Sequence, residues 1–318
     1  MKQATTPPKI QLQSRPTKRI SVNDALTQSL FSMTVAEYER ALNGGERTYL
    51  EAKTKKHGEV TSSYWLNVLD DERVKISRPL EEFDRDILDA CISAQDAGNP
   101  CVTVKGIWHG ITGKTSNDAK PTQPLKKEIL ERVDRLAVTR LTVDVTDACK
   151  KGIYPAGMKC RIRATLLPCR IVETELNGQL VDAVIHFDGQ SPLLQIARAR
   201  SGKRAQILSY ETALLDVPHQ RNTPTTTAIA NYLLRRIESA KAHINCARTI
   251  LLPTLMRQCG IVNATRWQRQ DVRKTVESVM KSFVDAGLIQ SFELVKQCGE
   301  FSKIAFKFSP ETSQKQRR

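Results

Sequence analysis

The sequence has no long hydrophobic run. None of its apolar stretches approaches the ~20 residues that a membrane-spanning helix needs. The first 19 residues are dominated by Thr, Pro, Gln and Lys/Arg and lack the apolar core of a secretory signal. We therefore expect a cytoplasmic protein with no membrane partner. A hydrophobic fraction of 40% with 26% charged residues is ordinary for globular domains, which excludes disorder of the whole chain.

The eight cysteines lack the spacing of a metal site. No two of them show C-x₂₋₄-C spacing, and the closest pair is Cys160 and Cys169. A structural zinc site usually has paired ligands about a turn apart, so we expect no metal. A disulfide framework is not expected either in a chain of this length without a secretory signal. The cysteines are then small apolar side chains in a reducing compartment.

Signatures of common catalytic centres are also missing. The five histidines are solitary, so the His-x-His pair of rolling-circle nicking enzymes is absent. No Gly-x-Ser-x-Gly motif occurs, and no closely spaced acidic cluster suggests the two-metal centre of a polymerase or primase. We expect no enzyme activity, no catalytic residue and no cofactor.

One string resembles the end of a phosphate-binding loop, Gly113-Lys114-Thr115. Such a loop needs a small residue where Trp108 stands, because the backbone must curl tightly around phosphate. It also needs a helix that starts at the lysine, whereas the residues after Lys114 show no apolar period. The pattern favours a helix that ends here, with Gly113 as its C-terminal cap.

Positive charge is concentrated at the end of the chain. The 318 residues contain 49 Lys+Arg and 34 Asp+Glu, a net charge of +15. Residues 1–57 carry a net +5, residues 58–220 are balanced, and residues 221–318 carry a net +10. A basic domain of about 100 residues is the usual electrostatic footprint of a nucleic-acid-binding protein. A merely solvated basic surface is the alternative.

Length and composition divide the chain into three parts. At ~100–200 residues per domain there is room for two domains and a tail. We expect residues 1–57 to be a basic arm, disordered through residue 20 and followed by a short helix. Residues 58–220 form a first domain with a linker, and residues 221–318 form a second domain with a basic tail.

Both domains show three helical patterns followed by a β-hairpin. In the first domain, the helices are expected at 81–97, 102–113 and 125–141, a strand at 141–145, and the hairpin at 160–187 around Asn177-Gly178. In the second, they are expected at 225–244, 249–259 and 265–286, with the hairpin around Cys298-Gly299. Between the domains, residues 193–197 and 206–208 are predicted strands and 212–215 a helical turn. This order predicts an α+β fold of two tandem winged-helix domains, a helix-turn-helix variant, with a disordered basic N-terminal arm.

The strongest functional signal lies at the start of the helix predicted at 265–286. Apolar residues from Val272 to Phe283 define its inward face, and Trp267 is expected to be a core anchor. Arginine and glutamine suit guanine and adenine edges, and the first turns of a recognition helix meet the bases. The side chains expected to contact DNA from this helix are Arg266, Arg269, Gln270, Arg273 and Lys274. A solvated polar helix face is the alternative.

Three lysines of the last hairpin are placed to meet phosphate, Lys296, Lys303 and Lys307. The third helix of the first domain also carries basic residues, but acidic ones alternate with them. That mixture is more typical of a salt-bridged surface or a protein interface than of a DNA-binding face.

With these two units, the chain resembles plasmid replication initiators built from two winged-helix domains. The resemblance spans roughly residues 60–310 and includes the stretches Phe83-Asp84-Arg85-Asp86-Ile87-Leu88-Asp89-Ala90 and Tyr232-Leu233-Leu234-Arg235-Arg236-Ile237. It implies that the first domain mediates homodimerisation and contacts the DNA backbone. The second domain would read repeated double-stranded sites at a plasmid origin. Host replication proteins (helicase and initiator) would be further partners. The hairpin at 160–187 is longer than this pattern needs.

Two other functions remain open from sequence. A transcriptional regulator could use the same DNA-binding module, with the neutral portion serving as a dimerisation or sensor domain. A replication enzyme such as a primase or nuclease is the third alternative. Direct repeats next to the gene would favour an initiator, and a metal-dependent activity assay would identify an enzyme.

Overall fold

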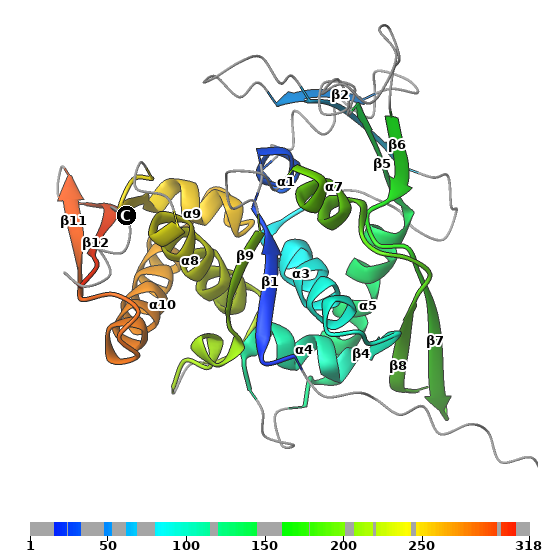
Figure 1. Ribbon diagram of the computed structural model, residues 1–318. Coiled ribbons are helices and arrows are strands. Elements are labelled where there is room, and N and C mark those ends of the chain that lie inside the picture. Colours follow the sequence, from blue (N-terminus) through cyan, green and yellow to red (C-terminus); the bar gives the residue numbers. More distant parts are fainter. Residues whose placement is uncertain are drawn as a thin grey trace, which may run out of the picture.

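The protein is an α+β structure with small antiparallel sheets, shown as a computed structural model in Figure 1. No helix in the described parts of the chain is long and apolar enough to cross a membrane. The structure describes residues 16–23, 25–32, 48–52, 62–68, 80–114, 120–144, 161–177, 179–200, 207–218, 221–242, 246–297 and 300–309.

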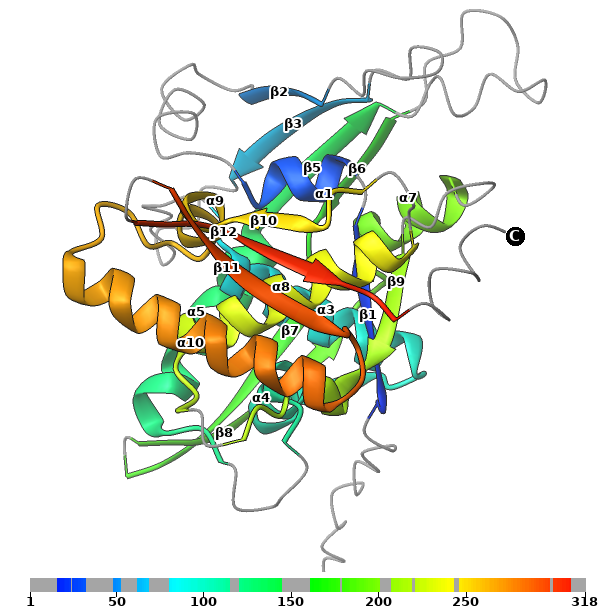
Figure 2. The ribbon, with the colours of Figure 1, turned by 90° about the vertical axis from the view of Figure 1, so that its left-hand side faces the viewer.

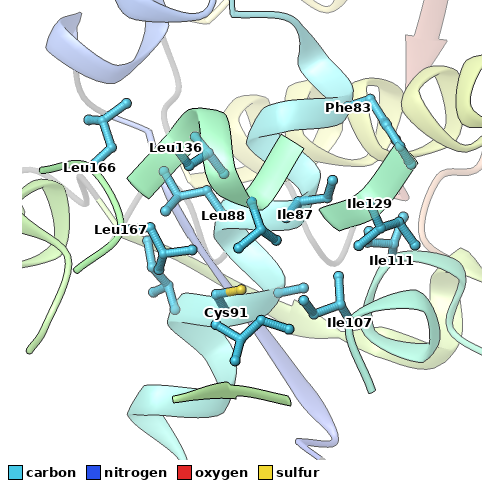
Figure 3. Close-up of a cluster of buried hydrophobic side chains, with 14 of the residues drawn as sticks. Phe83, Ile87, Leu88, Cys91, Ile107, Ile111, Ile129, Leu136, Leu166 and Leu167 are labelled. Atoms are coloured by element: carbon cyan, nitrogen blue, oxygen red, sulfur yellow. The ribbon is translucent and has the colours of Figure 1, made fainter. Parts of the chain in front are cut away.

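Helix α3 (Glu82–Asp96) is the centre of the first hydrophobic core. It packs against α4 (Val104–Thr112) and α5 (Gln123–Val138), and the three helices match the predicted ones to within a few residues. Figure 3 shows apolar side chains of all three helices meeting in this core. These include Phe83, Ile87, Leu88 and Cys91 of α3, Ile107 and Ile111 of α4, and Ile129 and Leu136 of α5.

Two small sheets accompany this core (Figure 1). One has the order β4-β8-β7, in which β8 (Gln179–Phe187) pairs with β4 (Cys101–Thr103) and with β7 (Cys169–Leu176). The hairpin predicted around Asn177 is present, and Asn177 has a φ of 52°, in the left-handed region that Asn tolerates. The other sheet has the order β2-β3-β5-β6 and consists of Thr48–Ala52, Ser62–Val68, Thr139–Asp144 and Arg161–Thr165.

A second core contains the last three helices. Helix α8 (Pro224–Ala242) packs against α10 (Arg266–Asp285) and the short α9 (Leu252–Gln258). A sheet of order β10-β12-β11 covers them, with strands β10 (Thr249–Leu251), β12 (Glu300–Lys307) and β11 (Ser291–Gln297). The predicted order of three helices and a hairpin is therefore observed, with a short strand ahead of α9.

An N-terminal strand lies between the two cores. Strand β1 (Lys18–Val22) pairs antiparallel with β9 (Ile207–Glu211), which precedes the 3₁₀ turn η1 (Thr212–Leu215). The expectation of disorder through residue 20 is therefore wrong for residues 18–20, and Arg19 is buried. A short helix was expected after residue 20, and the structure describes α1 (Ala25–Leu30) there. Residues 1–15 and 33–47 lie outside the described residues.

Two other strand predictions need correction. Residues 193–197 belong to helix α7 (Pro192–Arg200), because a short apolar run does not by itself distinguish a buried strand from a buried helix. Pro192 at the helix start was the available signal. The first strand of the hairpin predicted at 160–187 should run from residue 160 to 176. It is instead two strands in different sheets, β6 and β7, which are separated at Pro168. Proline interrupts a ladder because it has no N–H to donate.

Helix α3 carries buried charge on the face that meets α8 and β1. The guanidinium of Arg235 on α8 contacts Asp86 at 2.7 Å and Asp89 at 3.5 Å, and also pairs with Glu82. Arg19 on β1 lies 3.5 Å from the Asp86 carboxylate and donates to the Asp86 carbonyl at 2.7 Å. All five of these side chains are buried. The two cores are thus joined by ion pairs shielded from solvent.

The opposite face of α3 has a second buried cluster. Asp84 accepts hydrogen bonds from Arg132 at 3.2 Å and Arg135 at 2.5 Å, both on α5. Arg132 also pairs with Glu81 at 3.2 Å and Glu128 at 2.9 Å. The mixed charges of α5 were expected on a salt-bridged surface or an interface, and these two arginines instead pair inside the first core.

We expect Arg235→Met to lower the free energy of unfolding by about 3–5 kcal/mol, because three buried carboxylates lose their shared partner. Arg170→Met is the matched control, since Arg170 pairs with Asp188 at 2.8 Å with a side chain that is 75% exposed. Its loss should cost at most about 1 kcal/mol. Urea-induced unfolding measures both, and a loss for Arg235→Met no larger than the control's would contradict the assigned role.

The pKa of Asp86 gives a pH test of the same cluster. Burial raises this pKa to about 7, and Glu82 adds to the rise, although Arg235 and Arg19 oppose it. One Asp86 oxygen, Oδ2, has no hydrogen-bond partner, which fits an incompletely compensated carboxylate. An unfolded Asp titrates near ~3.9, so between about pH 4 and 7 the folded protein binds the proton more tightly than the unfolded chain. The contribution of Asp86 to stability therefore falls as pH rises through this window.

We expect the free energy of unfolding of the parent, minus that of Asp86→Asn, to decrease from pH 5 to pH 8. The asparagine does not titrate, so the difference isolates Asp86 from every other group. Urea unfolding at several pH values provides the measurement. A difference that rises with pH would mean instead that the arginines hold Asp86 ionised.

Candidate nucleic-acid interface

Helix α10 starts in a fully formed capping box. The Thr265 hydroxyl accepts from the Gln268 backbone N–H at 3.3 Å, and the Gln268 side-chain oxygen accepts from the Thr265 N–H at 2.9 Å. Two backbone donors that would otherwise be unpaired are satisfied in this way. The first turn of α10 is therefore held as helix although it lies at the surface.

The first six residues of α10, 266–271, are all exposed, and its burial begins only at Val272. The helix thus starts beyond the edge of the second core. Figure 2 shows α10 lying across the front of the molecule, with its N-terminal end at the left-hand margin. Exposed side chains therefore lie on every side of this end of the helix.

Further along α10, one stripe faces fully outward. Trp267, Gln270, Lys274 and Lys281 are exposed and follow one another at helical spacing. The opposite stripe is the predicted inward face, and it is buried as expected: Val272, Val276, Val279, Met280 and Phe283.

The expectation that Trp267 anchors the core is wrong. Its side chain is 77% exposed and lies on the outward stripe. The inward face starts at Val272, more than a turn later, so an apolar side chain at position 267 has no core to enter. A tryptophan before an apolar helical period looks like a core residue in sequence, and only the position of the core edge decides otherwise.

Arg273 is held by its neighbours. Its Nε donates to Glu277 Oε1 at 2.8 Å, and its guanidinium carbon lies 3.9 Å from the ring centroid of Phe301 on β12. Lys296 Nζ of β11 lies 5.1 Å from the same ring. Two of the predicted DNA-binding residues thus meet on one aromatic ring and join α10 to the hairpin. Phe301 was not anticipated from the sequence.

The other two hairpin lysines lie on the far side of the sheet. Ile304 and Phe306 of β12 are buried, and side chains alternate along a strand, so Lys303 and Lys307 face away from the helices. Lys303 is half-buried between its register partners Leu251 and Val295, whereas Lys307 is exposed. The eight predicted residues therefore form an exposed group on α10, a braced pair at Phe301 and a pair on the outer sheet face.

Basic side chains outnumber acidic ones on the exposed surface of residues 246–296 and 301–309. The exposed acidic residues are Asp271, Asp285 and Glu293. The exposed basic residues are Arg248, Arg257, Arg266, Arg269, Lys274, Lys281, Lys296 and Lys307. Sequence reasoning missed Lys281 as a candidate, although it follows Lys274 by seven residues on the same helix face.

Other candidate sites in the described residues have structural roles. No group of three His, Cys, Asp or Glu side chains there could hold a metal ion. Gly113 caps α4 as predicted, with a φ of 71°, and a Cβ on it would lie 2.4 Å from the Thr212 carbonyl oxygen. A helix therefore precedes Lys114, where a phosphate-binding loop needs a strand.

The chain is similar to two solved structures, both of domains 2 and 3 of RctB. One covers 85% of this chain and 95% of its own at a TM-score of 0.42 and 10% identity. A selenomethionine derivative of the same domains covers 86% and 99% at a TM-score of 0.41 and 11% identity. No family model matches the chain, and no curated protein matches it. Function is therefore inferred from the residues of this chain.

We expect the capping box to stabilise the start of α10. Thr265→Ala should lower the free energy of unfolding by about 0.5–2 kcal/mol, since it removes the hydroxyl that accepts from Gln268. Thr265→Ser keeps that hydroxyl and should stay close to the parent. Chemical unfolding compares the three proteins. Equal losses in both variants would show that the cap does not stabilise the helix.

Proposed function

We propose that the protein binds double-stranded DNA in a sequence-specific manner, with α10 as the helix that enters the major groove. The observation that carries the proposal is the exposed start of α10, where Arg266 and Arg269 accompany Gln270 and Lys274 of the outward stripe. Arginine and glutamine can each make two hydrogen bonds to one base edge. The proposed role is binding, without catalysis.

The charges at the start of α10 support this role. The N-terminal end of a helix is the positive end of its dipole, so acidic residues there stabilise it. The first turn of α10 contains no acidic residue and includes two arginines, Arg266 and Arg269. Like charges at this end cost about 0.3–1 kcal/mol each, which binding to an anion would offset. A phosphate backbone is such an anion.

Within this proposal the predicted residues have different roles. Arg266 and Arg269 contact DNA from the open end of α10, and Gln270 and Lys274 do so from its outward stripe. Arg273 braces the helix against Phe301 rather than reading bases, because its side chain is engaged with Glu277 and the ring. Lys296 extends the same face to the hairpin, where it can meet phosphate.

We further propose the fold and the role that the resemblance to plasmid replication initiators implies. The two helical units are tandem winged-helix domains, and the protein acts in the cytoplasm as a plasmid replication initiator. In this role it binds origin repeats, forms a homodimer through its first domain and recruits the host helicase and initiator. The support is the sequence resemblance together with an exposed basic helix in the second unit.

A salt titration tests the DNA-binding role. The full chain is titrated with a random-sequence duplex and with DNA flanking its own gene, at several salt concentrations. Arg266→Ala and Arg269→Ala should each weaken binding and lower the slope of log K against log salt by about one unit if they neutralise a phosphate. If either arginine instead contacts a base, its loss should cost about 1–3 kcal/mol on the preferred site.

Arg170→Ala serves as the control, since this arginine is also exposed but lies on β7 and pairs with Asp188. It should leave the affinity and the salt slope of α10-dependent binding unchanged. The proposal fails if the parent retards no duplex at low salt, or if both α10 variants bind like the parent while remaining folded.

A further inference from the structure

Trp267 is the most exposed large apolar side chain in the described part of the chain. Its 77% exposure exceeds that of Leu176 at 66% and Val262 at 64%. A single exposed apolar residue is common on protein surfaces and needs no explanation by itself. The position of Trp267 is what calls for one, because it lies on a capped helix end among basic side chains.

Trp267 and Gln270 are neighbours on the outward stripe of α10. Residues three apart on a helix have their Cβ atoms about 5–6 Å apart, so both side chains can reach one base pair or two adjacent ones. Glutamine recognises adenine through its N6 and N7 atoms in the major groove. The thymine paired with that adenine presents its 5-methyl group on the same groove edge, and an apolar side chain is its natural contact.

We propose that Trp267 packs against the 5-methyl group of a thymine in the major groove, beside an adenine that Gln270 recognises. The ligand is thus a duplex site with an A·T pair under the start of α10. This inference rests on the proposed function, since it requires α10 to enter the major groove.

The charges around Trp267 favour DNA over a protein partner. The exposed residues of α10 from 266 to 274 include three basic side chains, Arg266, Arg269 and Lys274, and one carboxylate, Asp271, which lies one turn after Trp267. An apolar side chain within a basic surface complements a groove in which methyl groups lie between rows of phosphates.

Thymine-to-uracil replacement tests the contact, because uracil lacks only the 5-methyl group. The full chain first selects its preferred duplex from a random-sequence pool. That duplex is then remade with each thymine replaced in turn by uracil. For the parent, one or two replacements should weaken binding about four-fold, the worth of one buried methyl group. Trp267→Ala should bind the thymine duplex more weakly and show no thymine–uracil difference at those positions.

Two further variants identify the residue responsible. Gln270→Ala should relax the preference for the adjacent adenine while keeping the thymine–uracil difference. Leu176→Ala removes a similarly exposed apolar side chain from β7 and should bind like the parent. Acrylamide quenching of tryptophan fluorescence adds a direct readout. DNA should protect the parent more than Trp267→Phe, in which only Trp65 and Trp108 still fluoresce.

The outcomes separate this inference from the proposed function. A parent that binds duplex DNA without any thymine–uracil difference overturns the methyl contact alone. A Trp267→Ala variant with the affinity and discrimination of the parent overturns the role of Trp267 and leaves its exposed ring to a protein partner. A parent that binds no duplex overturns the proposed function as well.

Discussion

The ion pairs on helix α3 are the constraint on which the rest of the structure depends. Every residue from Glu82 to Ala94 is buried, although this stretch carries five charged side chains. Its cluster towards α8 and β1 balances three carboxylates with three guanidinium groups, those of Arg19, Arg85 and Arg235. Burial lowers the pKa of Arg235, but Glu82 and Asp86 more than offset this effect, so the arginine stays charged. Removing one member would leave its partners uncompensated in the interior.

This cluster also joins the second core, which contains α10, to the first core. Arg235 belongs to α8, and α8 is the helix against which α10 packs. Asn231, one turn earlier, donates to the Ile111 carbonyl of α4 at 3.1 Å, which adds a neutral tie between the same two cores. Buried ion pairs contribute little net stability, but they are satisfied in only one arrangement. The charges on α3 therefore help to hold α8, the helix against which α10 packs, on the first core.

Sequence periodicity predicted most of the helices because each has one apolar stripe, as in α3, α5 and α10. It could not predict the buried charges of α3, since an acidic residue on a helix face normally implies solvent. It also could not predict that residues 18–22 pair with residues 207–211. That contact joins segments nearly 190 residues apart, and the same strand carries Arg19 to the cluster on α3. Local patterns contain no information about such distant pairing.

At the candidate site too, sequence patterns do not predict the surroundings of single side chains. Residue types alone identified the basic start of α10, but whether a side chain is free or engaged depends on where the core ends. Because the core begins at Val272, Trp267 is exposed, and because Phe301 lies beside the helix, Arg273 is a brace. Two rules of local sequence preference are broken at the start of α10. Arginines occupy the positive end of the helix dipole, and a tryptophan side chain is exposed to solvent. Sequences usually break such rules where function requires it, and the docking of α10 against DNA that we propose would account for both exceptions.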